Sequence, residues 1–484
     1  MKKYDIYILI AFFAIAYSVY AIIQHNNFGS HAYDLGIFDQ AVWHYSKLQW
    51  SANSVRDIGN ILGDHFHPIL ILLAPLYWLW SSPNMLFLAQ GFLIAFGALP
   101  IFWIARDKLK SHLIAITISL GYLIFWGIQS AVAFDFHEIA FFLFAFPFAF
   151  YFLTKKRWFW YFFFVAIILL TKENLALVVV ALGIYALLQK EWWVGIATII
   201  LGGGWFVMIT KFVIPKIAGA PYQYWSLTPL GADLPEALKT LIVKPIYSLK
   251  VFFLPAVKTN TMLKLLAPFL GLSILTPVAI ILLPTLAERF FSANSLYWTT
   301  GFHYSATIAP ILAIATIYGI ANLFTVLKRF HEKLNYEKFI LLTAYSLLLV
   351  NLLLLFTPNI PRPLLKLADK DFLTESVETT RGKLIIAQIP KDASVTAQEN
   401  IVPHLTHRDK IYQFEGGTHD TEYLIFNPTL STWPLSKEEY QKSVQEIWRK
   451  GQYGVKSSEG NWLILQKGLR SSQKLSPEIV NFLK

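Results

Sequence analysis

The feature that most constrains this chain is a succession of apolar runs, each close to the length needed to cross a lipid bilayer. A helical span needs roughly 20 residues. Eleven runs approach this length: 5–24, 84–105, 111–130, 138–154, 158–171, 174–189, 191–214, 242–257, 264–284, 303–326 and 338–356. Only 15% of the residues are charged, whereas about 25% are charged in a soluble domain. The sequence therefore predicts a polytopic α-helical membrane protein.

Lysine and arginine residues lie in short clusters between these runs, at positions 2–3, 106–110, 155–157 and 328–333. A net charge of +11 would suggest nucleic acid as a partner of a soluble chain, but clusters between spans follow the positive-inside rule instead. With the N-terminus in the cytoplasm, eleven spans of the cytoplasmic membrane place every cluster on the inner side. No small-residue cleavage site follows the first run, so a retained helix is favoured over a signal peptide.

The last part of the chain differs in character from the membrane module predicted for residues 1–357. A proline-rich linker begins it, and residues 358–484 contain short strand-like and helix-like segments. The predicted strands are 383–388, 411–414, 423–426 and 461–466, and the predicted helices are 399–405 and 437–450. An odd number of spans places this small α/β domain outside the cell.

The same topology gathers unusual polar motifs on the outer side. The first outer loop, residues 25–83, ends in an apolar stretch, 68–80, which is too short to cross and is expected to be an interfacial or re-entrant juxtamembrane helix. The polar motifs are HAYDLGIFDQ (31–40), HFHP (65–68), DFHE (135–138), KEN (172–174) and HYSATIAP (303–310). Their convergence on one side is the strongest functional signal in the sequence.

Two carboxylates, Asp34 and Asp39, lie near the predicted membrane surface, where an unpaired charge is costly. Five positions separate them, so on a helix they point in different directions and cannot form a tight pair. Asp34 could act as a general base that accepts the proton of an acceptor hydroxyl. The alternative is that both carboxylates cap a helix that begins near Leu35.

The motifs HFHP and DFHE offer imidazoles and a carboxylate. His65 and His67 could bind a phosphate when protonated, or a divalent metal with Asp34 or Asp135 when neutral. They could also be ordinary interfacial polar groups. Asp135 and His137 could support the first loop or hold that metal, although a carboxylate before a helix also complements the helix dipole without any other role.

Lys172, in the motif KEN, is suited to a lipid phosphate because its ammonium is a compact point charge. It could instead form an ion pair with the neighbouring Glu173 at a helix junction. His303 begins the tenth predicted span and could face the same cavity. The chain has no cysteine, which excludes disulfides and thiolate chemistry.

The order of these features resembles the GT-C superfamily of membrane glycosyltransferases, which includes the protein O-mannosyltransferases and the aminoarabinose transferases of lipid A. One span, a large outer loop with an acidic motif, further outer loops and an external α/β domain follow one another in both. More closely, the sequence resembles the membrane-protein family called domain of unknown function 2079. The motifs that carry this resemblance are DLGIFDQAVW (34–43), HFHPILILLAPLY (65–77), FDFHEIAF (134–141), TKEN (171–174), HYSATIAP (303–310) and PKDASVTAQENIVPHLTHR (390–408).

The resemblance implies an inverting transferase that moves a sugar from a polyprenyl-phosphate donor to a lipid, glycan or protein acceptor. Asp34 matches the first-loop aspartate that activates or positions the acceptor, although many relatives carry Asp-Glu where this chain has Asp34 and Leu35. The donor phosphate would lie near the cationic side chains. The residues expected to bind substrate are Asp39, His65, His67, Asp135, His137, Lys172, Glu173 and His303.

Some alternatives stay open at the level of sequence. No cofactor is certain, and the candidate ligands of a divalent metal are Asp34, His67, Asp135 and His137. A transporter should carry charges in the middle of its spans and show pseudo-symmetric halves, whereas the ionisable residues here cluster at one face. A non-catalytic envelope or lipid-binding protein would tolerate the loss of the Asp34 carboxylate.

Overall fold

The computed structural model describes residues 4–50, 52–357, 360–470 and 473–484. It divides into two compact units, each assembled from segments that are distant in sequence. Unit 1 comprises Met1–Ser18, His65–Ile69 and Leu88–Leu364, and unit 2 comprises Val19–Asp64, Leu70–Phe87 and Leu365–Lys484. Most of the predicted first outer loop therefore belongs to the same unit as the C-terminal domain.

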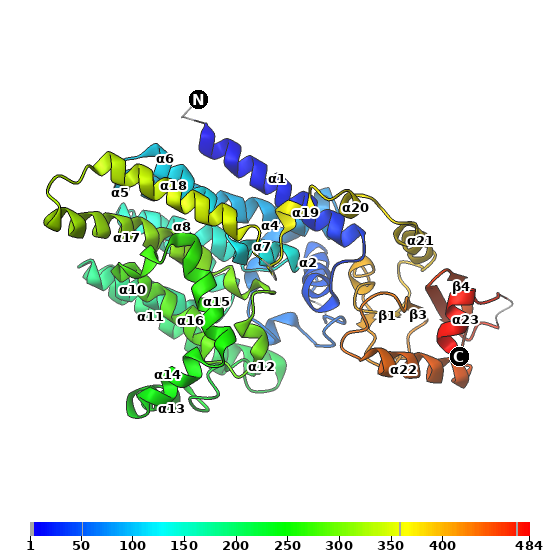
Figure 1. Ribbon diagram of the computed structural model, residues 1–484. Helices are drawn as coiled ribbons and strands as arrows, with labels where there is room; N and C mark the ends of the chain where they lie inside the picture. The colour runs from blue at the N-terminus through cyan, green and yellow to red at the C-terminus, as the bar shows by residue number, and fades with distance from the viewer. Residues whose placement is uncertain (1–3, 51, 358–359, 471–472) are drawn as a thin grey trace. The chain divides into compact units, whose positions relative to one another are not determined.

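Unit 1 consists mainly of apolar helices, most of them joined by short turns, with a longer connection at residues 219–233 (Figure 1). Its longer helices are α5 (Ala98–Leu109), α6 (His112–Leu123), α7 (Trp126–Ala133), α8 (Ala140–Thr154), α9 (Trp158–Thr171), α10 (Leu175–Leu188), α11 (Trp192–Met208), α13 (Leu234–Val243), α14 (Pro245–Phe253), α15 (Ala256–Leu266), α16 (Leu283–Phe290), α17 (Ile308–Phe330) and α18 (Tyr336–Leu354). Helices α1 (Asp5–Asn26) and α4 (Asn84–Phe96) contribute to both units.

Six helical segments within the described residues are long and apolar enough to cross a membrane. They are Asp5–Asn26, Asn84–Leu109, His112–Ala133, Trp192–Ala218, His303–Phe330 and Tyr336–Leu354. Three further predicted runs correspond to the shorter apolar helices α8, α9 and α10. The stretch 68–80 forms a 3-10 segment, η3 (Pro68–Leu73), followed by the short helix α3 (Ala74–Leu79).

Two predicted spans are not continuous helices. The run 242–257 is divided among α13, α14 and α15, because Pro245 and Pro255 cannot donate the backbone hydrogen bond that a helix interior requires. The run 264–284 contains three short 3-10 segments, η5 (Ala267–Phe269), η6 (Leu272–Ile274) and η7 (Pro277–Leu282). Its high apolar content therefore predicted burial in lipid or protein but not helical continuity.

The predicted inner turns of unit 1 lie together at one end of its helices. Lys155 Nζ, after α8, lies 2.7 Å from Asp107 Oδ2 near the end of α5. Lys156 Nζ lies 2.6 Å from Glu191 Oε1, which follows α10. The Tyr336 hydroxyl, at the start of α18, donates to the Leu109 carbonyl. These contacts bring the basic clusters at 106–110 and 155–157 to the same end as the start of α18, as the positive-inside pattern predicts. The cluster at positions 2–3 lies outside the described residues.

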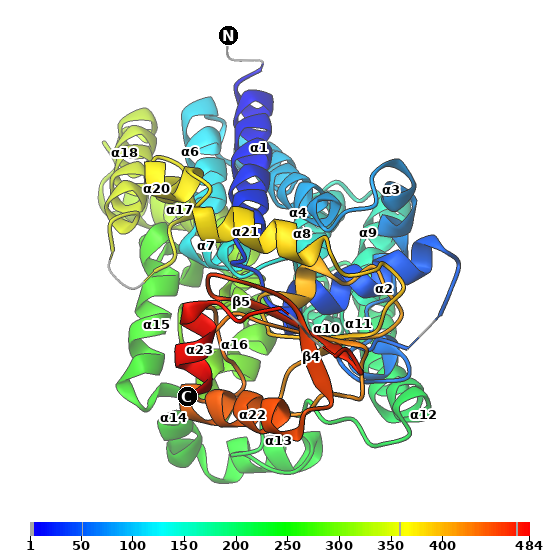
Figure 2. The ribbon, with the colours of Figure 1, turned by 90° about the vertical axis from the view of Figure 1, so that its right-hand side faces the viewer.

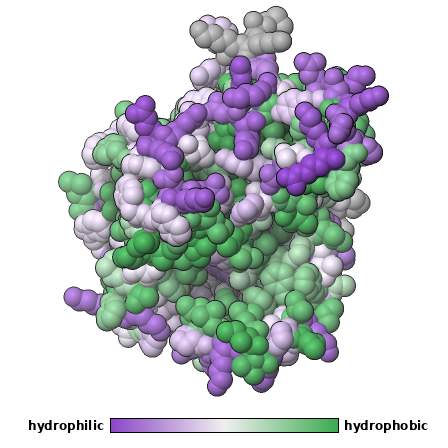
Figure 3. Space-filling model, turned by 90° about the vertical axis from the view of Figure 1, so that its left-hand side faces the viewer, coloured by the Kyte–Doolittle hydropathy of each residue, from purple (hydrophilic) through white to green (hydrophobic). Residues whose placement is uncertain are grey.

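One face of the molecule shows the segregation expected of a membrane protein. In Figure 3, most hydrophilic side chains gather toward the upper part of the face, and hydrophobic side chains form a broad field below them. Many large apolar side chains of unit 1 are exposed, including Phe159, Trp192, Phe212 and Ile242. In water this exposure would be a liability, but it matches a surface in contact with lipid.

Unit 2 contains a five-stranded sheet with the order β2-β1-β3-β5-β4. The strands are β1 (Val395–Ala397), β2 (Ile411–Gln413), β3 (Tyr423–Phe426), β4 (Tyr453–Glu459) and β5 (Trp462–Lys467). Strand β1 is parallel to β2 and β3, whereas β5 is antiparallel to β3 and β4. Helices α22 (Lys437–Lys450) and α23 (Pro477–Leu483) cover one face, and Tyr440, Val444 and Ile479 form a buried core with β3 and β5 (Figure 2).

Two sequence predictions for this domain are wrong. Residues 383–388, predicted as a strand, lie mostly in helix α21 (Val377–Ile386), because Ser376 caps the helix by accepting from the Thr379 N–H. The helix packs on the sheet, where Gly382 approaches the Trp462 ring so closely that a Cβ atom would clash. Residues 399–405, predicted as a helix, form only the 3-10 turn η10 (Val402–His404). The Asn400 side chain there donates to the Ser30 carbonyl.

The first outer loop packs on this domain within unit 2. A π-helical turn, η1 (Ala32–Gly36), leads into α2 (Ile37–Ser46). Gly36 lies against Val402, with only 3.3 Å between an added Cβ and a Val402 methyl. The buried Gln40 side chain donates to the Ser54 hydroxyl and to the Arg408 carbonyl. The acidic motif and the C-terminal domain are therefore one structural unit.

Candidate functional site

Buried charges gather in unit 1 at the ends of helices opposite the basic turns. Glu138 lies just before α8, whereas Lys155 follows that helix. Lys172 and Glu173 lie between α9 and α10, at the ends remote from Lys156 and Glu191. The charged groups of the outer motifs therefore share one end of the helices, in agreement with the predicted segregation of polar residues.

Lys172 pairs with Glu138 rather than with its neighbour Glu173. The distance from Lys172 Nζ to Glu138 Oε1 is 2.9 Å, and the Glu138 side chain is 1% exposed. Burial favours the neutral acid, but the Lys172 ammonium and the nearby His67 outweigh it and lower the pKa of Glu138 to about 2. Burial favours the neutral amine of Lys172, yet Glu138 and Glu173 raise its pKa above the ordinary value. Both groups are charged at neutral pH.

Glu173 binds the HFHP segment. Glu173 Oε1 lies 2.7 Å from His65 Nδ1, and Glu173 Oε2 accepts the Phe66 N–H at 3.0 Å. The Tyr222 hydroxyl also donates to Glu173 Oε1, at 3.1 Å. Burial opposes ionisation of this carboxyl, but His65 and Lys172 lower its pKa to about 2. Glu173 therefore fixes His65, whose ring stacks on Tyr224 at 3.9 Å between centroids.

His67 is buried and uncharged at neutral pH. Its side chain is 2% exposed, and burial lowers its pKa to about 4 although Glu138 acts in the opposite direction. His67 can therefore contribute a hydrogen bond to a phosphate but not a positive charge. Lys172 is the group of this cluster that can supply full charge to an anion.

A third carboxylate, Glu288 of α16, lies against the same helix junction. Both of its oxygens accept from the Asn174 amide, at 2.7 and 2.9 Å. Burial raises the pKa of Glu288, with only partial relief from Asn174 and Lys172. The adjacent Arg289 does not bind it, because its guanidinium donates to the Tyr297 and Thr299 carbonyls and to Ser305 Oγ. Arg289 thus stabilises the predicted outer loop at residues 288–303.

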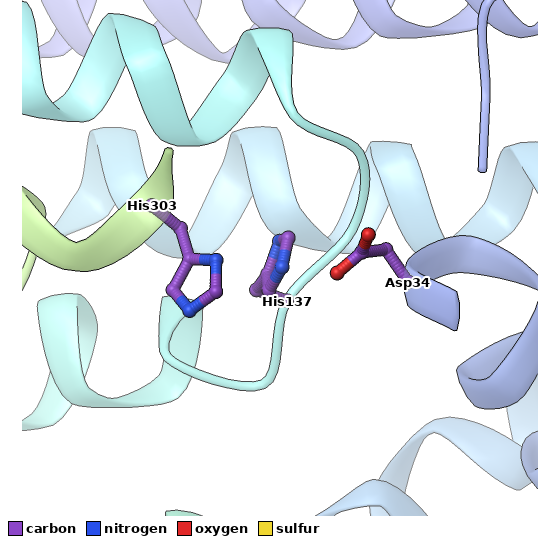
Figure 4. A group of neighbouring side chains, drawn as sticks. All are labelled: Asp34, His137 and His303. Carbon is purple, nitrogen blue, oxygen red and sulfur yellow. The ribbon is translucent and has the colours of Figure 1, made fainter. Parts of the chain in front are cut away.

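Two imidazoles, of His137 and His303, lie side by side in unit 1, with 3.9 Å between ring centroids (Figure 4). The backbone N–H of His137 donates to Gln90 Oε1, and Gln90 Nε2 donates to the Asp135 backbone carbonyl. Gln90 of α4 therefore holds the DFHE loop in place. Imidazole nitrogens are common ligands of divalent metals, so His137 and His303 are the ligand pair that unit 1 would offer to such an ion.

Asp34, also drawn in Figure 4, belongs to unit 2 and is half-buried. It lies inside the π-helical turn η1 and does not cap α2, whose N-cap residue is Gly36 without a side-chain cap bond. Asp34 is therefore not the N-cap of α2. Single turns of π-helix occur frequently at functional sites, which keeps Asp34 as the candidate base.

Asp39 occupies a different environment in unit 2. Its side chain is fully buried, and it accepts hydrogen bonds from the hydroxyls of Tyr77 and Thr406. His407 Nε2 lies 3.1 Å from Asp39 Oδ2. Burial favours the neutral acid, but His407 and the two hydroxyls hold the pKa of Asp39 below its usual value. Asp39 thus links α2, α3 and the C-terminal domain.

Sequence reasoning found most of the cluster in unit 1 but not all of it. The structure brings together His65, His67, Lys172 and Glu173 there, and it pairs His137 with His303. The sequence indicates Glu138 only as part of the DFHE motif, and it does not single out Glu288, Asn174 or Tyr222 as site residues. For Glu288 and Tyr222, the sequence offers only their residue types and their positions in predicted outer loops, which do not distinguish them from other loop residues.

The comparisons with known proteins agree with the predicted fold. A family model described as a predicted membrane protein (DUF2079) matches residues 24–465. No protein of curated function matches the sequence. The crystal structure of ArnT from Cupriavidus metallidurans bound to undecaprenyl phosphate is similar with a TM-score of 0.54 and 12% identity, covering 95% of this chain and 97% of that one. Its apo state gives a TM-score of 0.50 and 11% identity, covering 89% and 93%.

These likenesses confirm two predictions. The chain has a fold similar to that of ArnT, as the order of its motifs predicts. It combines apolar helices with a small C-terminal sheet domain. At 12% identity the likeness concerns the fold, so the chemistry must be argued from the residues of this chain.

Proposed function

Because the chain belongs to the DUF2079 family of membrane proteins and has an ArnT-like fold, we propose that it is a membrane glycosyltransferase with a polyprenyl-phosphate sugar donor. ArnT was crystallised with undecaprenyl phosphate, which supports this class of donor. The observation that carries the proposal is the partly buried ammonium of Lys172, which is paired with the buried carboxylate of Glu138 at the junction of α9 and α10. A buried cation beside lipid-facing helices suits a lipid-borne anion.

Lys172 has the role of binding the donor phosphate. In the structure Glu138 neutralises its charge, so a phosphate oxygen takes a place beside the same ammonium and competes with that carboxylate. His67, neutral at pH 7, donates or accepts a hydrogen bond, and Glu173 keeps His65 and the HFHP segment in position. Charge stabilisation matters here because the leaving group is a phosphate.

Asp34 has the role of general base. The acceptor hydroxyl oxygen attacks the anomeric carbon, its proton passes to the Asp34 carboxylate, and the bond from that carbon to the phosphate oxygen breaks. The electron pair of that bond leaves with the polyprenyl phosphate, so configuration at the anomeric carbon inverts. One positioned base contributes about 10²–10⁴-fold to rate.

The position of the charges favours a transferase over a transporter. A transporter pathway places ionisable groups in the middle of its spans, often at broken helices in symmetric halves. In the described part of unit 1, Glu138, Lys172 and Glu173 lie at helix ends. The proposed location is the cytoplasmic membrane, with the N-terminus inside and the sheet domain outside.

Substitution of Asp34 tests the proposed reaction. Cells with the native chain and cells with Asp34→Asn are compared for lipid-linked and surface glycans, with Asp371→Asn as a matched change of an exposed carboxylate in unit 2. We expect the glycan product to fall by about 10²–10⁴-fold in Asp34→Asn and to be unchanged in Asp371→Asn. Equal glycan levels in native and Asp34→Asn cells, at equal protein abundance, would refute Asp34 as the base.

Chelation tests the role of a divalent metal. If His137 and His303 hold an ion needed for transfer, EDTA abolishes transfer by the purified protein and added Mg²⁺ or Mn²⁺ restores it. Full activity in EDTA assigns charge stabilisation to Lys172 alone.

A further inference from the structure

A polar pocket lies within unit 2. Its volume is about 420 Å³, within the range of roughly 300–1,000 Å³ typical of small-molecule sites. One wall comes from the end of α2 and the following loop, and the other comes from the residues before and within the edge strand β2. The lining side chains that matter for recognition are His44, Asn53, Asp57, Asp409, Lys410 and Tyr412.

The wall made by the first outer loop is rigid before any ligand binds. Asn53 and Ile58 exchange backbone hydrogen bonds as an isolated β-bridge, and Asn53 Nδ2 donates to the Ile37 carbonyl. Gln40 Oε1 accepts the backbone N–H groups of Ser54 and Val55. A wall fixed by so many internal bonds loses little conformational entropy on binding.

The opposite wall is attached to the first through the edge of the sheet. The Ser54 hydroxyl accepts the Ile411 N–H of β2 at 3.0 Å, and His44 Nε2 lies 3.3 Å from Asp409 Oδ1. Tyr412 lines the pocket, and its ring stacks on His419 with centroids 4.5 Å apart and planes 4° apart. The Tyr412 ring is therefore a fixed aromatic surface beside polar groups.

The charge of the pocket selects against anions. Two carboxylates, Asp57 and Asp409, and one ammonium, Lys410, line the pocket, which gives it a net charge of −1. Burial lowers the pKa of His44, so its imidazole adds no positive charge at neutral pH. Carboxylate, amide and imidazole groups beside an aromatic face match a ligand with many hydroxyls and an apolar ring surface. A phosphate or a uronic acid would meet repulsion.

We propose that this pocket binds the glycan part of the acceptor, as a saccharide that carries no anionic group. The proposal rests on the glycosyltransferase function proposed above, and it assigns acceptor recognition to the unit that also contains Asp34. Asp57 and Asp409 accept hydrogen bonds from sugar hydroxyls, and Tyr412 contacts a ring face.

Saccharide binding to the full-length protein in lipid nanodiscs tests this assignment. The probes are chitotriose and maltotriose, which are neutral, and trigalacturonate, which is anionic; binding is followed by saturation-transfer NMR and calorimetric titration. We expect a neutral trisaccharide to bind at least tenfold more tightly than trigalacturonate. The double change Asp57→Ala with Asp409→Ala should weaken that binding at least tenfold, whereas Asp371→Ala, at an exposed carboxylate outside the pocket, should leave it unchanged.

Three results would overturn the assignment: no binding of either neutral saccharide, equal binding of trigalacturonate, or neutral-saccharide binding that survives the double change. An intact melting temperature of the double variant shows that a lost signal is not unfolding. Failure here is distinguishable from failure of the proposed function. Loss of product in Asp34→Asn without saccharide binding refutes only the pocket, and saccharide binding with full product in Asp34→Asn refutes only the base.

Discussion

Both units bury carboxylates, but they satisfy them in different ways. In unit 1, Glu138 pairs with the Lys172 ammonium, whereas Glu173 contacts His65 and accepts from the Tyr222 hydroxyl. In unit 2, Asp39 receives two hydroxyl groups as well as His407. Hydroxyl donors from separate elements fix the Asp39 carboxylate within the fold, whereas an ammonium can form charge-assisted hydrogen bonds with a carboxylate or a phosphate. The difference separates a group that supports the fold from a group that can bind a ligand.

Asp39→Ala should have the largest effect on stability. The change leaves the buried hydroxyls of Tyr77 and Thr406 without their acceptor, and each buried donor that loses its partner costs about 1–3 kcal/mol. Thermal unfolding in detergent should show a lower melting temperature for Asp39→Ala, with Asp371→Ala as the control. An unchanged melting temperature would contradict the structural role of Asp39.

The second-largest effect is expected from acid, which should lower the stability of unit 1. The pKa of His67 is about 4 in the folded protein, below its ordinary 6.5, so the unfolded chain binds the proton more tightly. The contribution of neutral His67 is complete above pH 6.5 and is lost as the pH falls to 4, by about 3 kcal/mol. Glu138 and Glu173, with pKa values of about 2, add a second loss only below pH 4.5.

Melting temperatures between pH 7 and pH 4 measure this effect. The slope in that window should be smaller in His67→Gln, which cannot take up the proton, than in the native chain. Equal loss of stability in the native chain and in His67→Gln between pH 7 and pH 4 would contradict the assignment of this acid sensitivity to His67.

Glu138→Gln should strengthen binding of polyprenyl phosphate moderately. The substitution removes the carboxylate that competes for the Lys172 ammonium, and a gain of about tenfold corresponds to about 1.4 kcal/mol. Titration of undecaprenyl phosphate into the protein in nanodiscs gives the affinity. Weaker binding by a folded Glu138→Gln protein would mean that Glu138 supports the phosphate site rather than opposing it.

The smallest effect is expected at the opposite end of unit 1. Lys155 and Asp107 form an exposed pair, with 42% and 52% of their side chains accessible. Exposed ion pairs contribute about 0–1 kcal/mol. Lys155→Ala should therefore leave both melting temperature and product formation close to native. A large loss of either would show that the exposed pair contributes as much to stability or activity as the charges at the opposite helix ends.

Much of the fold followed from hydrophobic length and polar segregation. The first, third and last spans lie close to their predicted positions, because long apolar runs have few other stable states in a bilayer. The runs 242–257 and 264–284 do not form continuous helices, because internal prolines divide them. In the sheet domain, residues 383–388 have an apolar pattern that fits a strand or a helix, and the Ser376 cap selects the helix.

The candidate site was predictable in composition but not in pairing. One-sided topology predicted that HFHP, DFHE and KEN would share one end of the helices. It could not show that Lys172 pairs with Glu138 and Glu173 with His65, rather than with each other. Such pairing is decided by tertiary packing between segments more than 30 residues apart, which no local pattern encodes.

Replacement of both charged residues at the helix junction by glutamine tests most directly whether Lys172 binds the donor phosphate. Glu138→Gln together with Lys172→Gln replaces a buried ion pair by two amides of similar size and should keep the fold, as shown by an unchanged melting temperature. The account predicts that this double variant loses most of its affinity for undecaprenyl phosphate, while Glu138→Gln alone does not. Native affinity in the folded double variant would contradict the assignment of Lys172 to the donor phosphate.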